Sequence, residues 1–245
     1  MALIEEFQKT GNWLFKRRGY LPAVLVATGI LIMVFTDYSR HPAPAIWYKL
    51  CCLGISAFGL WIRIYTVGHT PKHTSGRNIS RQKAQQLNTT GIYSLVRHPL
   101  YLGNFFIWLG IAMFVANAPF VFISLLVFWL YYERIMFAEE AFLREKFGDE
   151  FNSWAALTPS FIPRLNRYVS PRLPFSMKNV FKREYNGFGN IVATFTLIEL
   201  LRSSLISGRI YLPAGWIIFF AAGVFIWFTI RTLEKNTGIF EVEGR

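Results

Sequence analysis

The sequence predicts an all-α integral membrane protein with about six transmembrane helices. Three observations lead to this prediction. Apolar residues make up 53% of the 245 residues, charged residues only 16%, and the apolar residues gather in long runs. Soluble domains carry about 25% charged residues, and the mean hydropathy here is +0.32. The side chains of these runs are therefore expected to face lipid.

The distribution of positive charge supports a membrane environment. The net charge is +12, and the basic residues lie in the gaps between apolar runs, as in cytoplasmic loops that face an anionic leaflet. No motif for reading bases occurs, so the expected partner is the lipid bilayer and not nucleic acid. No pattern specifies an oligomeric state. Cys51 and Cys52 are adjacent in an apolar run, and a disulfide between them is not expected.

The first two spans are predicted at residues 20–38 and 45–68, within an N-terminal transmembrane unit of residues 1–68. Each run is long enough, or nearly so, for a hydrocarbon core of ~30 Å. The loop at 69–97 is basic and contains no acidic residue. The positive-inside rule places this loop and the basic cluster at 16–18 in the cytoplasm, on the same side, as two spans require.

A tight helical hairpin is predicted at residues 99–135. The apolar run that begins at Pro99 is too long for one span, and Asn117-Ala118-Pro119 interrupts it, because proline cannot continue a helix from the preceding turn. Each arm has about 17 residues, which corresponds to about 25 Å. The chain is expected to return to the cytoplasm near Glu133.

The rest of the chain is expected to contain a polar segment and two further spans. Residues 138–154 have the pattern of a surface helix, and the prolines that follow exclude a long helix. The apolar runs at 188–206 and 211–230 complete six spans with both termini cytoplasmic. Glu199 and Arg202 can pair on one helix face, and we expect a packing role for them. The predicted units are 1–68, a catalytic core at 69–170, and a C-terminal extension at 171–245.

Several kinds of site are not supported by the residues. His69 and His73 are separated by Pro71, which disfavours the helix that would aim both at one metal, so no metal site is expected. Gly187-Phe188-Gly189 lacks the strand and the acidic residue of a dinucleotide fingerprint. Neither a nucleophile elbow nor a Walker loop occurs.

One candidate site remains, and its first half precedes the hairpin. It consists of Arg97, His98, Pro99, Tyr101 and Gly103. Proline favours the first turn of a helix, so the N–H groups of residues 100–102 are expected to be unpaired and to form an anion site suited to a carboxylate. Gly103 leaves room for a flat ligand or for another backbone.

The second half of the candidate site is Glu139 and Glu140, which directly follow the hairpin. Because the two arms are antiparallel and of equal length, both halves are expected at one membrane face. Together they would bind a ligand with a carboxylate, an ammonium and hydroxyl groups, which is the pattern of S-adenosylmethionine. The spacing equally allows Arg97 and His98 to anchor a helix to headgroups and the two glutamates to form a solvated helix face.

The order of the motifs resembles the isoprenylcysteine carboxyl methyltransferase family, to which phospholipid N-methyltransferases are related. The resemblance covers residues 89–165, from "TTGIYSLVRHPLYLGNF" to "AEEAFLREKFGDEFNSWAALTPSFIPRL". It combines Arg-His-Pro-x-Tyr-x-Gly, the Glu-Glu pair, Phe-Gly-x-x-Phe, and Pro-Ser-Phe-Ile-Pro at 159–163.

The resemblance implies an integral membrane enzyme with a cytoplasmic pocket for S-adenosylmethionine. Arg97 is similar to the arginine that orients the acceptor, and Arg97 and Glu140 are the expected catalytic residues. The expected cofactor contacts are Tyr93, Leu95, His98, Pro99, Tyr101, Gly103, Glu139 and Glu140. Tyr93 and Leu95 are expected beside the adenine. The chain departs from the family in having Phe151 where a tyrosine is usual, and in its extension beyond residue 170.

The expected function is methyl transfer from S-adenosylmethionine to a lipophilic small molecule or a lipidated acceptor in the membrane. Carboxylate O-methylation is favoured, and N-methylation of a phospholipid amine is next. One alternative is an NADPH-dependent membrane reductase of the steroid-reductase type, because the basic residues at 72–97 could pair with its extra phosphate. Another is a non-enzymatic membrane scaffold.

Overall fold

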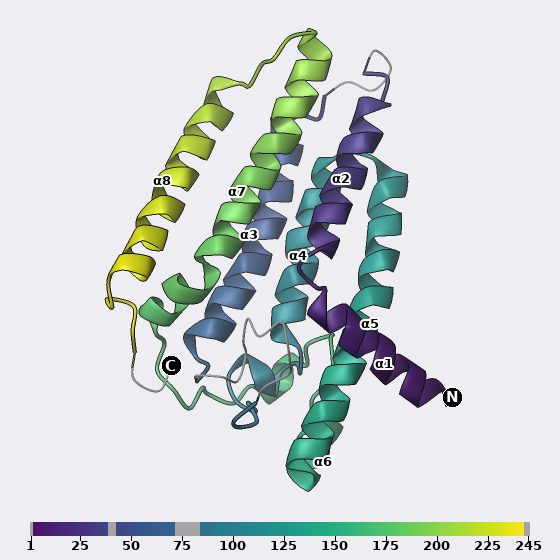
Figure 1. Cartoon of the computed structure of the whole chain (residues 1–245), viewed down its shortest axis with the longest axis vertical. Helices are drawn as coiled ribbons and strands as arrows, with labels where there is room; N and C mark the ends of the chain where they lie inside the picture. The colour runs from purple at the N-terminus through teal and green to yellow at the C-terminus, as the bar shows by residue number, and fades with distance from the viewer. Residues whose placement is uncertain (1, 39–42, 72–83, 243–245) are drawn as a thin grey trace.

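The protein is all-helical in the residues that the computed structural model describes, which are 2–38, 43–71 and 84–242. No strand occurs in these ranges, so the all-α prediction is confirmed. The long helices run side by side, and the first helix lies across one end of the bundle (Figure 1). The α-helices in chain order are α1 (Leu3–Lys16), α2 (Leu21–Val34), α3 (Ile46–Gly68), α4 (Pro99–Phe114), α5 (Ala118–Phe147), α6 (Asp149–Leu157), α7 (Met177–Ser207) and α8 (Ala214–Asn236).

All six predicted apolar runs form helices, but they differ in length. In the described chain, α3, α5, α7 and α8 are each long and apolar enough to cross a membrane. Helices α1 and α2, bent by 76° at their junction, make a fifth span if they are counted together. Helix α4 has 16 residues, which corresponds to about 24 Å, less than the ~30 Å core. The chain is therefore a multi-pass membrane protein with four or five such spans.

The break between α4 and α5 occurs where the sequence predicts it. Helix α4 ends at Phe114, and Ala116 adopts a positive φ of 63° in the connection. The Asn117 side chain then caps α5 by accepting a hydrogen bond from the Phe120 N–H at 2.9 Å. Pro119 occupies the first turn, where its missing N–H leaves no hydrogen bond unmade. The two helices consequently form the predicted hairpin, but its second arm is longer than predicted, because α5 continues without a break to Phe147. The surface helix expected at 138–154 is instead the end of α5 followed by α6.

Small residues bring α3 and α4 into close contact. A Cβ atom at Gly59 would lie 2.4 Å from the Gly103 carbonyl oxygen, and one at Gly110 would lie 2.2 Å from Ser56 Oγ. The Ser56 hydroxyl donates to the carbonyl of Ile107 at 2.9 Å. In lipid, helices associate through such close packing and interhelical hydrogen bonds, because the hydrophobic effect gives no advantage to helix–helix contact. These contacts fix the position of α4 along α3.

Two buried ion pairs align α7 with α3. Arg63 binds Glu184 through two bonds, Nε to Oε2 at 2.8 Å and Nη2 to Oε1 at 2.9 Å. Lys49 pairs with Glu199 near the other end. The partners are 14 residues apart on α3 and 15 on α7, about 21 Å along each axis, so the helices are antiparallel and in register. The predicted Glu199–Arg202 pair is confirmed at 2.8 Å, and it lies in this second contact.

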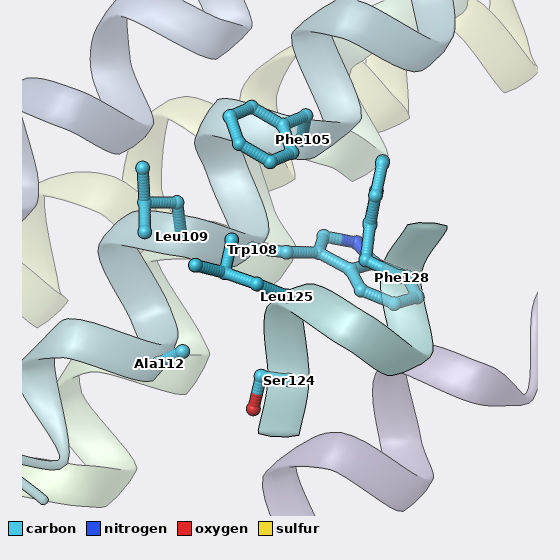
Figure 2. Close-up of a pocket in the computed structure, with 7 residues that line it drawn as sticks. All are labelled: Phe105, Trp108, Leu109, Ala112, Ser124, Leu125 and Phe128. Atoms are coloured by element: carbon cyan, nitrogen blue, oxygen red, sulfur yellow. The ribbon is translucent and has the colours of Figure 1, made fainter. Parts of the chain in front are cut away.

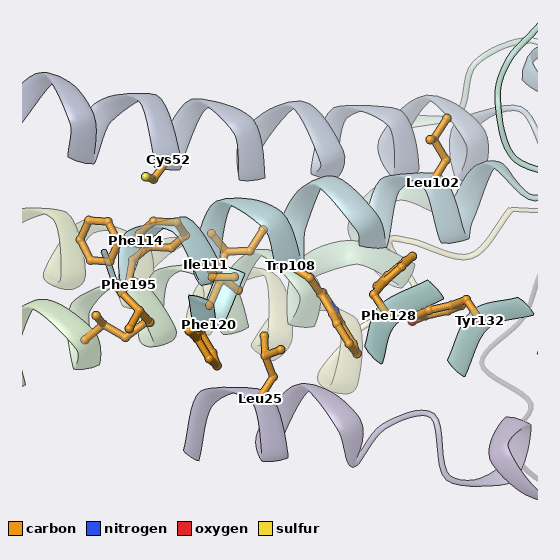
Figure 3. Close-up of a cluster of buried hydrophobic side chains, with 14 of the residues drawn as sticks. Leu25, Cys52, Leu102, Trp108, Ile111, Phe114, Phe120, Phe128, Tyr132 and Phe195 are labelled. Atoms are coloured by element: carbon orange, nitrogen blue, oxygen red, sulfur yellow. The ribbon is translucent and has the colours of Figure 1, made fainter. Parts of the chain in front are cut away.

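The apolar core lies between α2, α3, α4, α5 and α7. Figure 3 shows aromatic side chains of α4 and α5 in the middle of this layer, between α2 and α3. Trp108 contacts Phe128 edge to face, with ring centroids 5.4 Å apart. In Figure 1 α1 and the C-terminal end of α8 lie at the end of the bundle where α4 begins and α6 follows α5. The candidate site lies at this end.

Candidate active site at one end of the hairpin

The two halves of the predicted site meet. His98 is the residue before α4, and Glu139 and Glu140 lie on α5. His98 Nε2 is 2.9 Å from Glu140 Oε1, and His98 Nδ1 is 3.6 Å from Glu139 Oε2. Arg97 Nε lies 2.9 Å from the same Glu140 oxygen. The predicted convergence of the residues before and after the hairpin is confirmed.

The charges in this cluster balance one another. Burial by itself lowers the pKa of His98, but hydrogen bonds with Glu139 and Glu140 outweigh it and hold the pKa above its ordinary value. Two basic side chains, Arg97 and His98, face the two carboxylates, and Arg18 lies within electrostatic range of Glu139. A ligand that carries both an ammonium and a carboxylate can replace partners on both sides without leaving an unpaired charge. The arrangement is therefore suited to a zwitterionic ligand.

The proline-containing segment after α6 holds the arginine and the histidine in place. The backbone N–H of Arg97 donates to the Pro159 carbonyl at 2.9 Å, and that of His98 donates to the Ser160 carbonyl at 3.2 Å. The Arg97 guanidinium also donates to the Ala155 carbonyl at 2.8 Å. The Pro-Ser-Phe-Ile-Pro motif at 159–163 thus positions the backbone of Arg97 and His98.

The expected anion site made of backbone N–H groups is largely absent. The N–H groups of Tyr101 and Leu102 both donate to the His98 carbonyl, at 3.1 and 3.0 Å. The prediction that these groups are unpaired is wrong, because the residue before a helix supplies the carbonyl that accepts the first helical bonds. Arg97 is therefore the more suitable anion-binding group at this end of α4.

Tyr101 and Gly103 point in different directions. The Tyr101 ring stacks on His98 with centroids 5.6 Å apart, and its phenol interacts with Glu139. Gly103 faces α3, where an added Cβ would lie 2.5 Å from Arg63 Cγ. Of the two uses expected for Gly103, the structure shows the approach of another backbone, since an added Cβ would also lie 2.8 Å from the Gly59 carbonyl oxygen. Pro99 is buried in the first turn.

Tyr93 and Leu95 lie on the segment that leads into the site. The Tyr93 carbonyl accepts a hydrogen bond from Trp154 Nε1 at 3.1 Å, and the Leu95 carbonyl accepts one from the Arg164 N–H at 2.9 Å. Both side chains are half-buried. Residues 72–83 of the predicted basic loop, His73 among them, lie outside the described residues.

Several residues beside the site were not singled out by the sequence analysis. Arg18 lies within electrostatic range of Glu139, whereas the basic cluster at 16–18 by itself indicates only the topology of the chain. Asn104 Oδ1 accepts from Arg63 at 2.8 Å, and Asn104 Nδ2 donates to the Tyr132 hydroxyl at 2.9 Å. Asn104 is a polar residue within the apolar run of the first arm, and this could have drawn attention to it.

A small apolar hollow lies between α4 and α5, deeper in the bundle. Its empty space of about 200 Å³ includes volume that is open to the surroundings. Figure 2 shows Phe105 at one end of it and Ser124 at the other. The Ser124 hydroxyl is buried and has no hydrogen-bond partner in the part of the chain that the structure describes. The lining residues are Phe105, Trp108, Leu109, Ala112, Ser124, Leu125 and Phe128.

Comparison with known proteins identifies a matching family. Residues 48–150 match the model of the phospholipid methyltransferase family. The chain is 32% identical to a nickel-cobalt-cadmium resistance protein of Alcaligenes xylosoxydans xylosoxydans, over 60% of this chain and 65% of that protein. It is 35% identical to a protein-S-isoprenylcysteine O-methyltransferase of Schizosaccharomyces pombe, over 47% of this chain and 50% of that protein.

A third relative extends the comparison to another bacterial protein. The cobalt-zinc-cadmium resistance protein of Cupriavidus metallidurans is 33% identical, over 59% of this chain and 63% of that protein. The matches thus span between half and two thirds of the length of these curated relatives. No solved structure gives a significant match.

Proposed function

From the match of residues 48–150 to the phospholipid methyltransferase family, we propose that the chain is a membrane methyltransferase that uses S-adenosylmethionine and acts on a lipophilic acceptor. The observation that carries the proposal is the contact of His98 and Arg97 with Glu140 at one end of the hairpin. Three residues of two separate motifs form one charged cluster there, beside the lipid-facing helices.

The side chains of the cluster fit the proposed cofactor. Glu139 and Glu140 are only partly exposed, at 32% and 17%, and they can accept hydrogen bonds from an ammonium and from ribose hydroxyls. Arg97 pairs with Glu140 through Nε at 2.9 Å, and the planar guanidinium of this residue suits a carboxylate or a phosphate of the acceptor. When bound, S-adenosylmethionine supplies a methyl group on a positively charged sulfur, which is left as a neutral thioether.

The protonation states favour an acceptor that is already ionised. An amine must lose a proton before it can take a methyl group and so needs a base. Burial alone would raise the pKa values of Glu139 and Glu140, but His98 lowers them, so these carboxylates are weak bases. The imidazole of His98 is already paired with both carboxylates. A carboxylate is ionised near neutral pH and needs none. We therefore favour carboxylate O-methylation over amine N-methylation, with Arg97 orienting the acceptor.

The proposed activity assigns roles to two parts of the chain and a side of the membrane to the site. Residues 69–170 form the catalytic unit, and the extension at 171–245 supports it through α7, whose Glu184 binds Arg63. The site end of the bundle faces the cytoplasm, because the basic residues concentrate at that end. A water-soluble cofactor would then enter from the cytoplasm and the acceptor from the lipid.

Calorimetry in detergent tests the cofactor site. The wild-type protein is expected to bind S-adenosylmethionine, and His98→Ala and Glu140→Ala to bind it at least about tenfold more weakly, which is ~1.4 kcal/mol. Glu133→Ala, one turn or more away on the same helix and outside the cluster, is the matched control and should bind normally. Unchanged affinity in both site variants would reject the site.

The same experiment with NADPH separates the alternatives. Binding of NADPH without binding of S-adenosylmethionine would replace the proposal with the reductase, and binding of neither would favour a scaffold. Incubation of the wild-type protein with labelled S-adenosylmethionine and a total lipid extract, followed by mass analysis, would then identify the acceptor.

A further inference from the structure

A chain of hydrogen bonds leads from the C-terminal extension to the α4–α5 hairpin. Glu184 of α7 accepts from Arg63 of α3 at 2.8 and 2.9 Å. Arg63 Nη1 donates to Asn104 Oδ1 of α4 at 2.8 Å, and Asn104 Nδ2 donates to the Tyr132 hydroxyl of α5 at 2.9 Å. Four helices thus contribute to one chain of polar groups within the membrane.

The direction of every hydrogen bond in this chain is fixed by its chemistry. A guanidinium can only donate, so the oxygen of the Asn104 amide must face Arg63. The amide nitrogen must then face Tyr132, and it too can only donate. The Tyr132 oxygen is consequently an acceptor in this contact, and its own hydrogen is left to donate elsewhere.

No described residue accepts that hydrogen. The only hydrogen bond of the Tyr132 hydroxyl in the described chain is the one from Asn104, and Tyr132 is 2% exposed. A buried donor without an acceptor costs about 1–3 kcal/mol. The chain from Glu184 to Tyr132 therefore holds one donor ready, in a place where bulk water does not compete.

Tyr132 lies between the charged cluster and the apolar hollow. Its ring is 4.9 Å from that of Tyr101, which stacks on His98. On the other side its ring is 4.3 Å from that of Phe128, which lines the hollow. Tyr132 is seven residues before Glu139 on α5, about 10 Å deeper along the helix.

We infer that the Tyr132 hydroxyl is a specificity-determining contact that donates a hydrogen bond to an oxygen of the acceptor, about 10 Å below its methylated group. The inference rests on the proposed function and adds to it the class of acceptor. The acceptor carries a polar linkage, such as an ester, ether or amide oxygen, between its head and its apolar chain. Asn104, Arg63 and Glu184 are positioning residues that orient this donor.

Acceptors with and without such an oxygen test the inference. Tyr132→Phe removes only the hydroxyl, and it is expected to raise KM about tenfold for a lipid carboxylate with an oxygen at that depth. KM for an all-hydrocarbon carboxylate of the same length should not change. Tyr131→Phe is the matched control, because the Tyr131 hydroxyl donates to the Leu14 carbonyl at 3.0 Å instead. It should leave both KM values unchanged.

A second variant tests the orientation of the chain. Asn104→Asp keeps the size of the side chain and the bond to Arg63, but its carboxylate would accept the Tyr132 hydrogen. Asn104→Asp is expected to raise KM for the oxygen-containing acceptor, as Tyr132→Phe does. The double variant Asn104→Asp/Tyr132→Phe should show no further rise in this KM. Calorimetry with S-adenosylmethionine should give wild-type affinity in all these variants.

The outcomes separate the two proposals. Failure of the wild-type protein to bind S-adenosylmethionine would overturn the proposed function. Normal cofactor binding with equal KM changes for both acceptors, or with none, would overturn the role of Tyr132 alone. Lower thermal stability of Tyr132→Phe without any KM difference between acceptors would show a purely structural hydroxyl.

Discussion

Replacing Glu199 with leucine tests whether buried charges hold α7 in the bundle. The Glu199 carboxylate is 2% exposed and pairs with Arg202 at 2.8 Å and with Lys49. Arg202 is 1% exposed and also donates to the Phe114 carbonyl. Glu199→Leu leaves both cations without a carboxylate, whereas α3, α4 and α7 otherwise keep their side chains.

The expected loss of stability follows from burial. Breaking a buried pair by removing one partner costs about 3–5 kcal/mol, because the remaining charge is uncompensated. The lower end of this range is expected for Glu199→Leu, since the Phe114 carbonyl still accepts from Arg202 and the Lys49 side chain is 13% exposed. The triple variant Lys49→Met/Glu199→Leu/Arg202→Met leaves no charge unpaired. It should recover most of the loss.

Unfolding by SDS titration in mixed micelles, followed by tryptophan fluorescence, measures these free energies. The chain has eight tryptophans as probes. A triple variant that is as unstable as Glu199→Leu, or less stable, would refute the argument from uncompensated charge. A single variant within about 1 kcal/mol of wild type would show that Glu199 is solvated in the folded protein.

Three further predictions follow. His98 has a raised pKa in the folded state, so its contribution to stability is complete below its ordinary pKa of about 6.5 and is lost as pH rises through the folded value. The Tm difference between wild type and His98→Gln should therefore shrink from pH ~6 to pH ~8.5, and a constant difference would contradict this. Ser124→Ala removes a buried hydroxyl without a described partner and should be neutral or stabilising by about 1 kcal/mol in SDS titration, whereas a clear loss would reveal a partner. Gly110→Ala places a Cβ 2.2 Å from Ser56 Oγ and should lower the free energy of unfolding by about 1–3 kcal/mol. The control Gly54→Ala, whose Cβ would meet nothing within 4 Å, should leave it unchanged, and equal effects would argue against close α3–α4 packing.

The hairpin and its meeting residues could be predicted because local rules define them. Asn117 and Pro119 mark the break, and the antiparallel return of the chain along α5 brings Glu140 to the same end as His98, although α5 continues beyond it to Phe147. The number of full-length spans was less predictable. Apolar runs identify helices, but α4 has only 16 residues and α1 is bent by 76° from α2, and neither fact follows from hydropathy.

The sequence by itself determined that the helices face lipid, where the helices lie, and which segments carry the charged cluster. It could do so because hydropathy, charge placement and proline act over a few neighbouring residues. Only the tertiary structure decided that Gly103 packs against α3 and that Arg63 pairs with Glu184 of α7. It also decided that Asn104 donates a hydrogen bond to the Tyr132 hydroxyl. Those partners are distant in the chain, and no local pattern specifies which polar group a buried side chain will meet. Burial then requires each polar group to find a partner.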